Sequence, residues 1–159
     1  MVYKKKISPG TGNLKVAGAD TVIPLRIINL QEDGFQPVLN ITLFGKSFIL
    51  VLDTGASKTA FDETLLLQAH KQAILTVSDK LSTGLGTNTM VSSTAVIDDL
   101  YIGTFLVETF EAAVLDLSTI NVAYGQLGHP EVLGVLGGDI LMKYKAVIDY
   151  EKQQLRLSL

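Results

Sequence analysis

The chain has 159 residues, of which 47% are apolar and 18% charged, and its net charge is −3. This composition excludes an intrinsically disordered protein, and the length fits a single domain with a real core. The acidic balance and a pI near 5.3 argue against nucleic acid as a main partner, because that partner usually requires a basic surface. The sequence has no cysteine, which excludes disulfides, thiolate metal sites and cysteine nucleophiles.

The first twenty residues contain Gly, Lys and Pro without a regular pattern. We therefore expect an N-terminal arm over residues 1–20 and one domain over residues 21–159. No stretch is long and apolar enough to predict a membrane span, and the basic start lacks the apolar segment of a signal peptide. A cytoplasmic location is the default expectation, and a mature periplasmic or secreted chain whose leader has been removed is the alternative.

Short apolar runs, often β-branched, follow one another from residue 22 onward and are separated by Gly, Asp, Asn or Pro. This pattern is typical of strands joined by turns. Helical spacing of Leu and Ala predicts a helix over 62–73, which Asp62 could cap, and a second helix is expected over 137–144. The predicted strands cover residues 22–29, 38–44, 46–52, 90–97, 99–103, 104–115 and 146–150. The chain is therefore expected to be mostly β with one or two short helices.

Two segments of the chain resemble each other. Residues 39–57 and residues 98–118 each contain a strand, a glycine turn, a second strand and an apolar run that ends in Val-Leu-Asp. Such a repeat predicts a pseudo-twofold core in which only the first copy continues with Thr-Gly. Chance similarity between two β-hairpins is the alternative.

Asp53 follows the apolar run FILVL, which looks like a buried strand. A charged carboxylate at the end of such a strand costs free energy unless a nearby group makes use of it. Gly55 permits a sharp turn, Thr54 adds a hydroxyl, and Ala56 and Ser57 are small. Such a loop can present a carboxylate at a defined point on a rigid scaffold. The alternative is an Asp that only caps the turn with its own side chain.

Three chemistries use an aspartate after an apolar strand. Phosphotransferases of the haloacid dehalogenase type need a second Asp where this chain has Gly55. ATPases of the actin and sugar-kinase type need a second phosphate loop and a much longer chain. Aspartic proteases need two carboxylates that share one proton, which splits their pKa values so that one acts as base and the other as acid.

The sequence resembles the retropepsins, the retroviral-type aspartic proteases, in two places. LVLDTGAS, over residues 50–57, is similar to their active-site loop, and residues 132–157 are similar to the closing segment of retropepsins and pepsin lobes. The resemblance covers about residues 22–157. It implies a single-lobe acid-protease fold, a closed barrel, in which the strand over 135–137 crosses behind the aspartate loop. The extra length of this chain suggests a bacterial or cellular member of the family.

The resemblance also implies roles for individual residues. Asp53 would be the catalytic carboxylate, Thr54 would make a hydroxyl contact between two subunits, and Gly55 would offer its backbone to the substrate. A glycine-tipped flap would close over the bound peptide, although a plain surface turn is the alternative for that segment. The expected substrate-binding residues are Gly55, Ala56, Ser57, Thr83, Gly84, Leu85 and Gly86.

The chain has a single Asp-Thr-Gly, because the second copy of the repeat ends with Asp116-Leu117-Ser118 and lacks the glycine. An active enzyme is therefore expected to be a symmetric homodimer with one Asp53 from each subunit and a peptide or protein as substrate. No metal or cofactor is expected, since His70 and His129 have no ligand spacing. The rival hypothesis is a dimerisation or peptide-binding module of the same fold without significant proteolysis.

Two further expectations concern carboxylates. Pepsin-like enzymes carry a serine hydroxyl that can bond the catalytic carboxylate, but this chain has Ala56 at that position. We therefore expect the carboxylate pair to titrate at a higher pH and the activity to have a mildly acidic optimum. Asp139, which follows a double glycine, is expected to cap the last helix.

Overall fold

The computed structural model describes residues 20–73, 75–78 and 92–159. Of the expected N-terminal arm, only Asp20 is among these residues, so the boundary at residue 20 stays a prediction. Asp20 accepts a hydrogen bond of 2.7 Å from the Ser158 hydroxyl and lies 3.6 Å from the Arg156 guanidinium. These contacts connect the start of the described chain to its last strand.

The first part of the chain forms strands with one α-helix. In order, the elements are β1 (Thr21–Pro24), β2 (Arg26–Asn29), the 3₁₀ helix η1 (Gln31–Asp33), β3 (Phe35–Leu43), β4 (Lys46–Leu52), β5 (Ala60–Asp62), α1 (Glu63–Ala69) and β6 (Leu75–Ser78). The β3–β4 hairpin turns at Phe44 and Gly45, whose φ angles are 48° and 75°. Both angles lie in the left-handed region, which glycine adopts most readily and which this kind of hairpin turn requires. The predicted cap is confirmed, because the Asp62 side chain accepts a hydrogen bond from the backbone N–H of Leu65.

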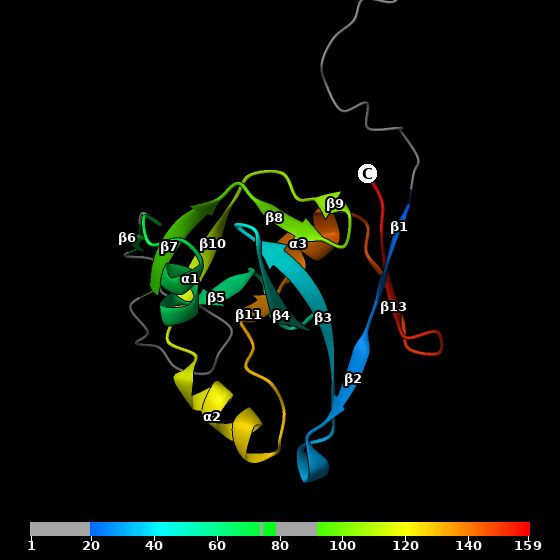
Figure 1. The fold of residues 1–159 in the computed structure, drawn as a ribbon. Coiled ribbons are helices and arrows are strands. Elements are labelled where there is room, and N and C mark those ends of the chain that lie inside the picture. The colour runs from blue at the N-terminus through cyan, green and yellow to red at the C-terminus, as the bar shows by residue number, and fades with distance from the viewer. Residues whose placement is uncertain (1–19, 74, 79–91) are drawn as a thin grey trace, which may run out of the picture.

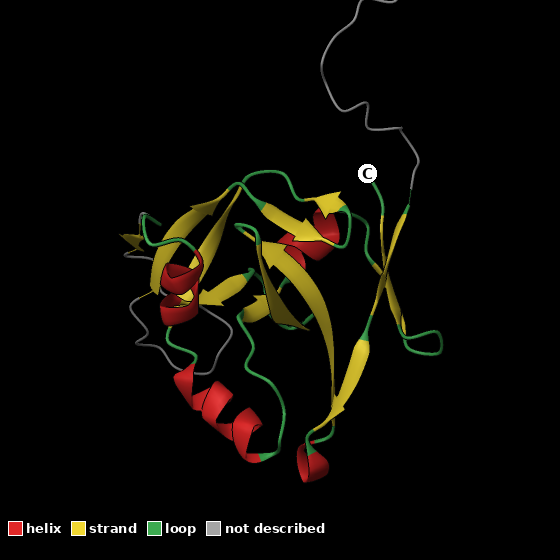
Figure 2. Ribbon diagram, in the orientation of Figure 1, coloured by secondary structure: helices red, strands yellow, loops and turns green. Residues whose placement is uncertain are grey.

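The second part of the chain contains two more α-helices between short strands. The elements are β7 (Ser92–Ile97), β8 (Leu100–Ile102), β9 (Phe105–Leu106), β10 (Phe110–Leu115), α2 (Ser118–Gln126), β11 (Gly134–Leu136), α3 (Gly138–Lys143), β12 (Val147–Asp149) and β13 (Gln154–Leu157). Figure 2 shows α2 at the edge of the molecule, below α1 in this view.

Most strands belong to one curled sheet (Figure 1). Its ten strands follow the order β6-β7-β10-β5-β11-β4-β3-β8-β9, and β2 pairs with β3. A separate three-stranded sheet contains β1, β13 and β12. The expected mostly β architecture is confirmed, but the large sheet is a half-barrel and not a closed barrel, because its end strands β6 and β9 are not neighbours.

The order of antiparallel and parallel strand pairs in the middle of the large sheet is symmetric about its centre. From β7 through β10, β5, β11 and β4 to β3, the pairs alternate antiparallel, parallel, antiparallel, parallel and antiparallel. This pattern relates β4 to β10 and β5 to β11 by a pseudo-twofold axis between β5 and β11. The Val-Leu-Asp strands of the sequence repeat, β4 and β10, are therefore equivalent in the sheet, but the counterpart of β3 is β7 and not β8, which the repeat had aligned with it.

The core lies inside the curl of the sheet. Its fully buried side chains include Leu43 of β3, Leu50 of β4, Leu66 of α1, Leu100 of β8 and Tyr144, which follows α3. Burial of this apolar surface is the main stabilising term, and it holds the central strands β4, β5 and β11 rigidly.

Three details differ from the prediction. The strand expected over 22–29 is divided into β1 and β2, which belong to different sheets. The strand expected over 104–115 is divided into β9 and β10, and residues 107–109 between them are not in a strand. The third α-helix, α2, was not predicted, so the described chain has one helix more than expected. Among the residues that the structure describes, no helix has the length and apolar character needed to cross a membrane.

Candidate active site

The site begins where β4 ends. Val51 and Leu52 pair in parallel with Val135 and Leu136 of β11, and both partners lie in the middle of the sheet. The backbone N–H of Asp53 donates a hydrogen bond of 3.1 Å to the Leu136 carbonyl. The strand expected to cross behind the aspartate loop is therefore present, and it fixes where Asp53 leaves the sheet.

Asp53 forms a tight turn with the two residues after it. Its Oδ1 accepts a hydrogen bond of 2.9 Å from the Gly55 N–H, and its carbonyl accepts one of 3.3 Å from Ala56. A Cβ added to Gly55 would lie only 3.2 Å from that Oδ1, which is tighter than an ordinary contact. Glycine at position 55 therefore allows the backbone to approach and orient the carboxylate.

The rest of the loop is held by the start of α3. Gly138 donates a hydrogen bond of 2.8 Å to the Ala56 carbonyl, and Asp139 donates one of 3.2 Å to the Ser57 carbonyl. A Cβ added to Gly137 would lie 2.6 Å from the Lys58 carbonyl carbon. The two backbones touch at this point, so only glycine fits at position 137.

Asp139 connects α3 to the far end of the same loop. Its Oδ1 accepts hydrogen bonds from the Thr59 hydroxyl (2.7 Å), the Thr59 N–H (2.9 Å) and the Ile140 N–H (2.8 Å). The Thr59 hydroxyl, which is fully buried, in turn accepts one of 3.0 Å from the Gly137 N–H. The prediction that Asp139 caps this helix is wrong, because the N-cap residue is Gly137 and Asp139 binds the aspartate loop instead.

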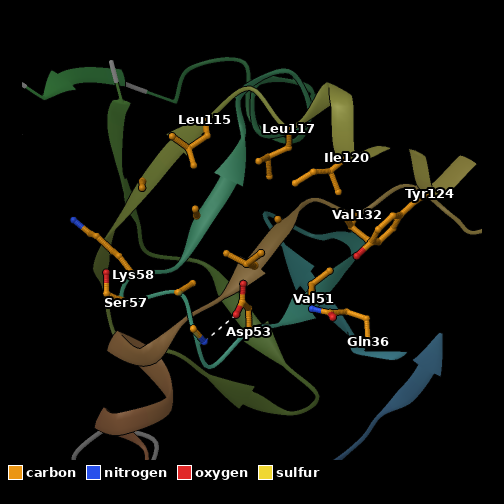
Figure 3. Close-up of a pocket in the computed structure, with 16 residues that line it drawn as sticks. Gln36, Val51, Asp53, Ser57, Lys58, Leu115, Leu117, Ile120, Tyr124 and Val132 are labelled. Atoms are coloured by element: carbon orange, nitrogen blue, oxygen red, sulfur yellow. Dashed lines mark hydrogen bonds between the residues drawn. The ribbon is translucent and has the colours of Figure 1, made fainter. Parts of the chain in front are cut away.

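Asp53 faces a pocket of about 310 Å³ (Figure 3). In that view Lys58 and Ser57 lie on one side, Tyr124 and Gln36 lie on the other, and Asp53 lies between them. The remaining lining residues are small or apolar: Val51, Gly55, Ala56, Ala60, Ala113, Leu115, Leu117, Ile120, Val132, Gly134 and Val135. A half-buried carboxylate therefore opens into a mostly apolar cleft of the size that binding sites usually have.

Comparison with known proteins identifies the family. The family model described as Aspartyl protease (Asp_protease_2) matches residues 39–140, which is more than half of the 159-residue chain. The chain belongs to this aspartyl protease family. No match was found among curated proteins.

Solved structures of similar fold support the same architecture. A retropepsin-like aspartic protease from Rickettsia conorii matches with a TM-score of 0.52 and 20% identity, over 90% of this chain and 94% of that chain. The retroviral protease-like domain of Ddi1 from Leishmania major matches with a TM-score of 0.50 and 13% identity, over 76% of this chain and 86% of that chain. At these identities the matches show the fold, and they confirm the predicted retropepsin-like fold.

The predicted site residues of this aspartyl protease family member fall into three groups. Asp53, Gly55, Ala56 and Ser57 line the pocket. Thr54 is exposed and is not among the lining residues, and its contact with a second subunit stays a prediction. The expected flap residues, Thr83, Gly84, Leu85 and Gly86, lie outside the described residues, so the flap stays a prediction.

The sequence interpretation missed the opposite wall of the pocket. This wall consists of Leu117, Ile120 and Tyr124, from the start and the body of α2, while Gln36 of β3 adds a polar group near them. Positions 117, 120 and 124 have the spacing of one helix face, and this was the signal that could have found them.

The pocket is lined by a lysine, an aspartate and a tyrosine, Lys58, Asp53 and Tyr124. Lys58 forms an exposed ion pair of 3.0 Å with Glu111, outside the pocket lining. Burial, together with the negative charge of Asp53, raises the pKa of Tyr124 above its ordinary value of 10.0. Within the described part of the chain, no group of three or more His, Asp or Glu side chains is arranged to hold a metal ion.

Proposed function

We propose that this protein is an aspartic endopeptidase that hydrolyses peptide bonds with a water molecule activated by two Asp53 carboxylates, one from each subunit of a homodimer. The observation that carries the proposal is the position of Asp53. Its carboxylate is oriented by the Gly55 N–H, its backbone is fixed to β11, and it faces a cleft that could take a substrate side chain. Membership of the aspartyl protease family supports this reading.

The need for a second copy follows from the charges around the pocket. Asp53 is the one carboxylate among the lining residues, and the chemistry requires two that share a proton. Thr54 is exposed beside it, so a second copy could approach the loop. A symmetric dimer would place the two loops face to face, and each chain would contribute half of the site.

In the proposed mechanism one Asp53 is ionised and the other protonated. The ionised carboxylate takes a proton from the bound water while the water oxygen attacks the carbonyl carbon of the peptide. The protonated carboxyl donates its proton to the carbonyl oxygen, which forms a neutral tetrahedral intermediate. The C–N bond then breaks as the nitrogen takes the proton of the protonated carboxyl, while a hydroxyl of the intermediate gives its proton to the ionised carboxylate. This releases an amine and a carboxylic acid and leaves one proton on the dyad, as at the start.

The test compares Asp53→Asn with wild type, and Asp116→Asn serves as the matched control. Each protein is given a peptide library between about pH 4 and pH 7, and light scattering records its oligomeric state. We expect Asp53→Asn to lose cleavage by at least about 10³-fold while it stays dimeric, because the exchanged proton has no acceptor. Asp116→Asn should keep wild-type activity.

Three results would contradict the proposal. Equal cleavage by Asp53→Asn and wild type would exclude Asp53 as the catalytic group. A wild-type protein that stays monomeric under cleaving conditions would exclude the shared dyad. A stable wild-type dimer that cleaves nothing would favour the alternative, a dimerisation or peptide-binding module.

A further inference from the structure

Helix α2 forms a fixed wall of the pocket opposite Asp53. Asn121 in its middle makes two hydrogen bonds with the backbone of Val132, one of 3.0 Å to the carbonyl and one of 2.8 Å from the N–H. The helix start is anchored as well, because the Leu117 N–H donates a hydrogen bond of 2.8 Å to the buried Asp62 carboxylate. Side chains on the pocket face of α2 are therefore held in place before any substrate binds.

Tyr124 is held from its outer side. The His129 N–H donates a hydrogen bond of 2.9 Å to the Tyr124 carbonyl, and the two rings meet edge to face with centroids 6.4 Å apart. The His129 Nε2 lies 2.7 Å from the Asn29 carbonyl, so β2 fixes the histidine in turn. The phenol ring is thus set against the pocket by contacts that leave its hydroxyl unused.

The Tyr124 hydroxyl has no hydrogen-bond partner among the described residues, although it borders a pocket that is largely apolar. Gln36, the other polar group at this side of the pocket, is also half-buried (Figure 3). A polar group that loses contact with water on ligand binding costs free energy unless the ligand supplies a partner. A ligand that fills this pocket with hydrocarbon alone would leave the phenol unsatisfied.

Tyr124 is a hydrogen-bond donor at the pH at which an aspartic protease would work. The ordinary pKa of tyrosine, 10.0, lies far above that range, and burial and the charge of Asp53 raise the Tyr124 pKa further. A protonated phenol can donate one hydrogen bond and accept others.

We propose that Tyr124 determines specificity, by hydrogen bonding to the polar end of a bulky substrate side chain that fills the pocket beside the scissile bond. This inference rests on the proposed endopeptidase function and names the chemistry of its substrate. The preferred side chain is apolar along its length, to suit Leu115, Leu117 and Ile120, and ends in a hydroxyl or amide, as in tyrosine or glutamine. Side chains of similar shape without that end group, such as phenylalanine, are disfavoured.

The experiment measures binding rather than turnover, so that it does not depend on catalysis. Wild type, Tyr124→Phe and Tyr101→Phe are titrated by calorimetry with paired peptides in which a hydroxyethylene group replaces the scissile amide. The two peptides of a pair differ only in tyrosine or phenylalanine beside that group. Tyr101 is the matched control, because it is an exposed tyrosine on β8 and does not line the pocket. The amide versions of the same peptides are tested for cleavage.

Wild type is expected to bind the tyrosine peptide about tenfold more tightly than the phenylalanine peptide, the effect of one well-placed hydrogen bond. Tyr124→Phe should reduce this preference to less than about twofold without weakening the phenylalanine peptide, and Tyr101→Phe should preserve it. The proposal is overturned if wild type shows no preference, binds neither peptide, or keeps its preference in Tyr124→Phe. An equal loss for both peptides in Tyr124→Phe would also overturn it, because that would indicate a packing role.

The two proposals fail separately. Selective binding that depends on Tyr124, without cleavage of the amide peptides, would contradict the endopeptidase function and leave this inference standing. Cleavage of both amide peptides, with a binding preference that Tyr124→Phe leaves unchanged, would support the endopeptidase function and contradict this inference.

Discussion

The loops that follow β4 and β10 occupy related positions in the pseudo-twofold core, yet they do different things. Both strands end in Val-Leu and are followed by an aspartate, whose Oδ1 accepts a 2.9 Å hydrogen bond from the N–H two residues later. Asp53 is half-buried and lines the pocket, whereas Asp116 is exposed and leads into α2. The same local turn therefore supports a candidate catalytic group in one half and a pocket wall in the other.

The anchoring of the two loops is also reciprocal. Helix α3 follows β11, and its Asp139 holds Thr59 at the end of the first loop. Helix α1 follows β5, and its cap Asp62 holds Leu117 at the start of the second loop. Each half thus uses a carboxylate at a helix start to hold the loop of the other half. The difference between the halves lies in the glycines at 55, 137 and 138, which surround only the first loop.

Gly137→Ala is expected to destabilise the scaffold more than the loss of either reciprocal anchor, Asp62 or Asp139. The new Cβ would lie 2.6 Å from the carbonyl carbon of Lys58 and 2.9 Å from the Ala56 oxygen, and neither backbone can move away easily. We expect a loss of at least about 3 kcal/mol of stability and of all activity, as measured by denaturant unfolding and peptide cleavage.

Gly138→Ala is the matched control for this change. The nearest atom to its added Cβ is the Ala56 oxygen at 3.5 Å, which is an ordinary contact. Its stability should therefore stay within about 1 kcal/mol of wild type. Equal stabilities for the two variants would show that the close approach at position 137 does not constrain the loop.

A smaller effect is expected when the reciprocal anchors are removed. Asp139→Ala deprives the buried Thr59 hydroxyl and N–H of their acceptor, and Asp62→Ala does the same to the N–H groups of Leu65 and Leu117. Each should lower the free energy of unfolding by about 1–3 kcal/mol.

The two variants should differ in what they do to function. Asp139→Ala loosens the loop that carries Asp53, so kcat for peptide cleavage should fall further in this variant than in Asp62→Ala. Asp62→Ala loosens the start of α2, so peptide KM should rise with a smaller change in kcat. The opposite assignment, measured under conditions where both proteins are folded, would contradict the division of roles between the halves.

The smallest effect concerns the pH dependence of stability at Asp116. Hydrogen bonds from the hydroxyl and the N–H of Ser118 hold the pKa of this carboxyl below its ordinary value of 3.8. A lowered folded-state pKa stabilises the protein above the unfolded-state pKa, and this contribution is lost as the pH falls through the folded-state value. Asp116→Asn should therefore lower Tm slightly near pH 6, and this deficit should shrink as the pH falls below 3.8. A deficit that grows in acid would contradict this account.

The sequence predicts the local features of the fold better than the long-range ones. The strand over 46–52, the hairpin turn at Gly45 and the cap at Asp62 depend on neighbouring residues, and all three are as expected. Helix α2 was missed because its sequence, STINVAYGQ, contains β-branched residues and a glycine and has no side-chain cap. It is held instead by distant contacts, such as those between Asn121 and Val132.

The candidate site also has a local part that the sequence predicts and a long-range part that it does not. The Asp53 loop could be predicted because its chemistry lies in consecutive residues. The role of Asp139 could not, because its partner Thr59 is 80 positions away and the usual reading of an Asp after Gly-Gly is a helix cap. Gln36 and Tyr124 line one pocket only because β3 and α2 are brought together by the fold.

The central claim is that two copies of Asp53 act as one site, and a subunit-mixing experiment tests it most directly. Wild type and Asp53→Asn are refolded together at a constant total concentration, and cleavage is measured as the wild-type fraction is varied. Two carboxylates from different subunits predict a rate proportional to the square of that fraction, so an equal mixture keeps about one quarter of the full activity. A rate proportional to the fraction itself, with about one half remaining, would show that each chain works alone and would contradict the account.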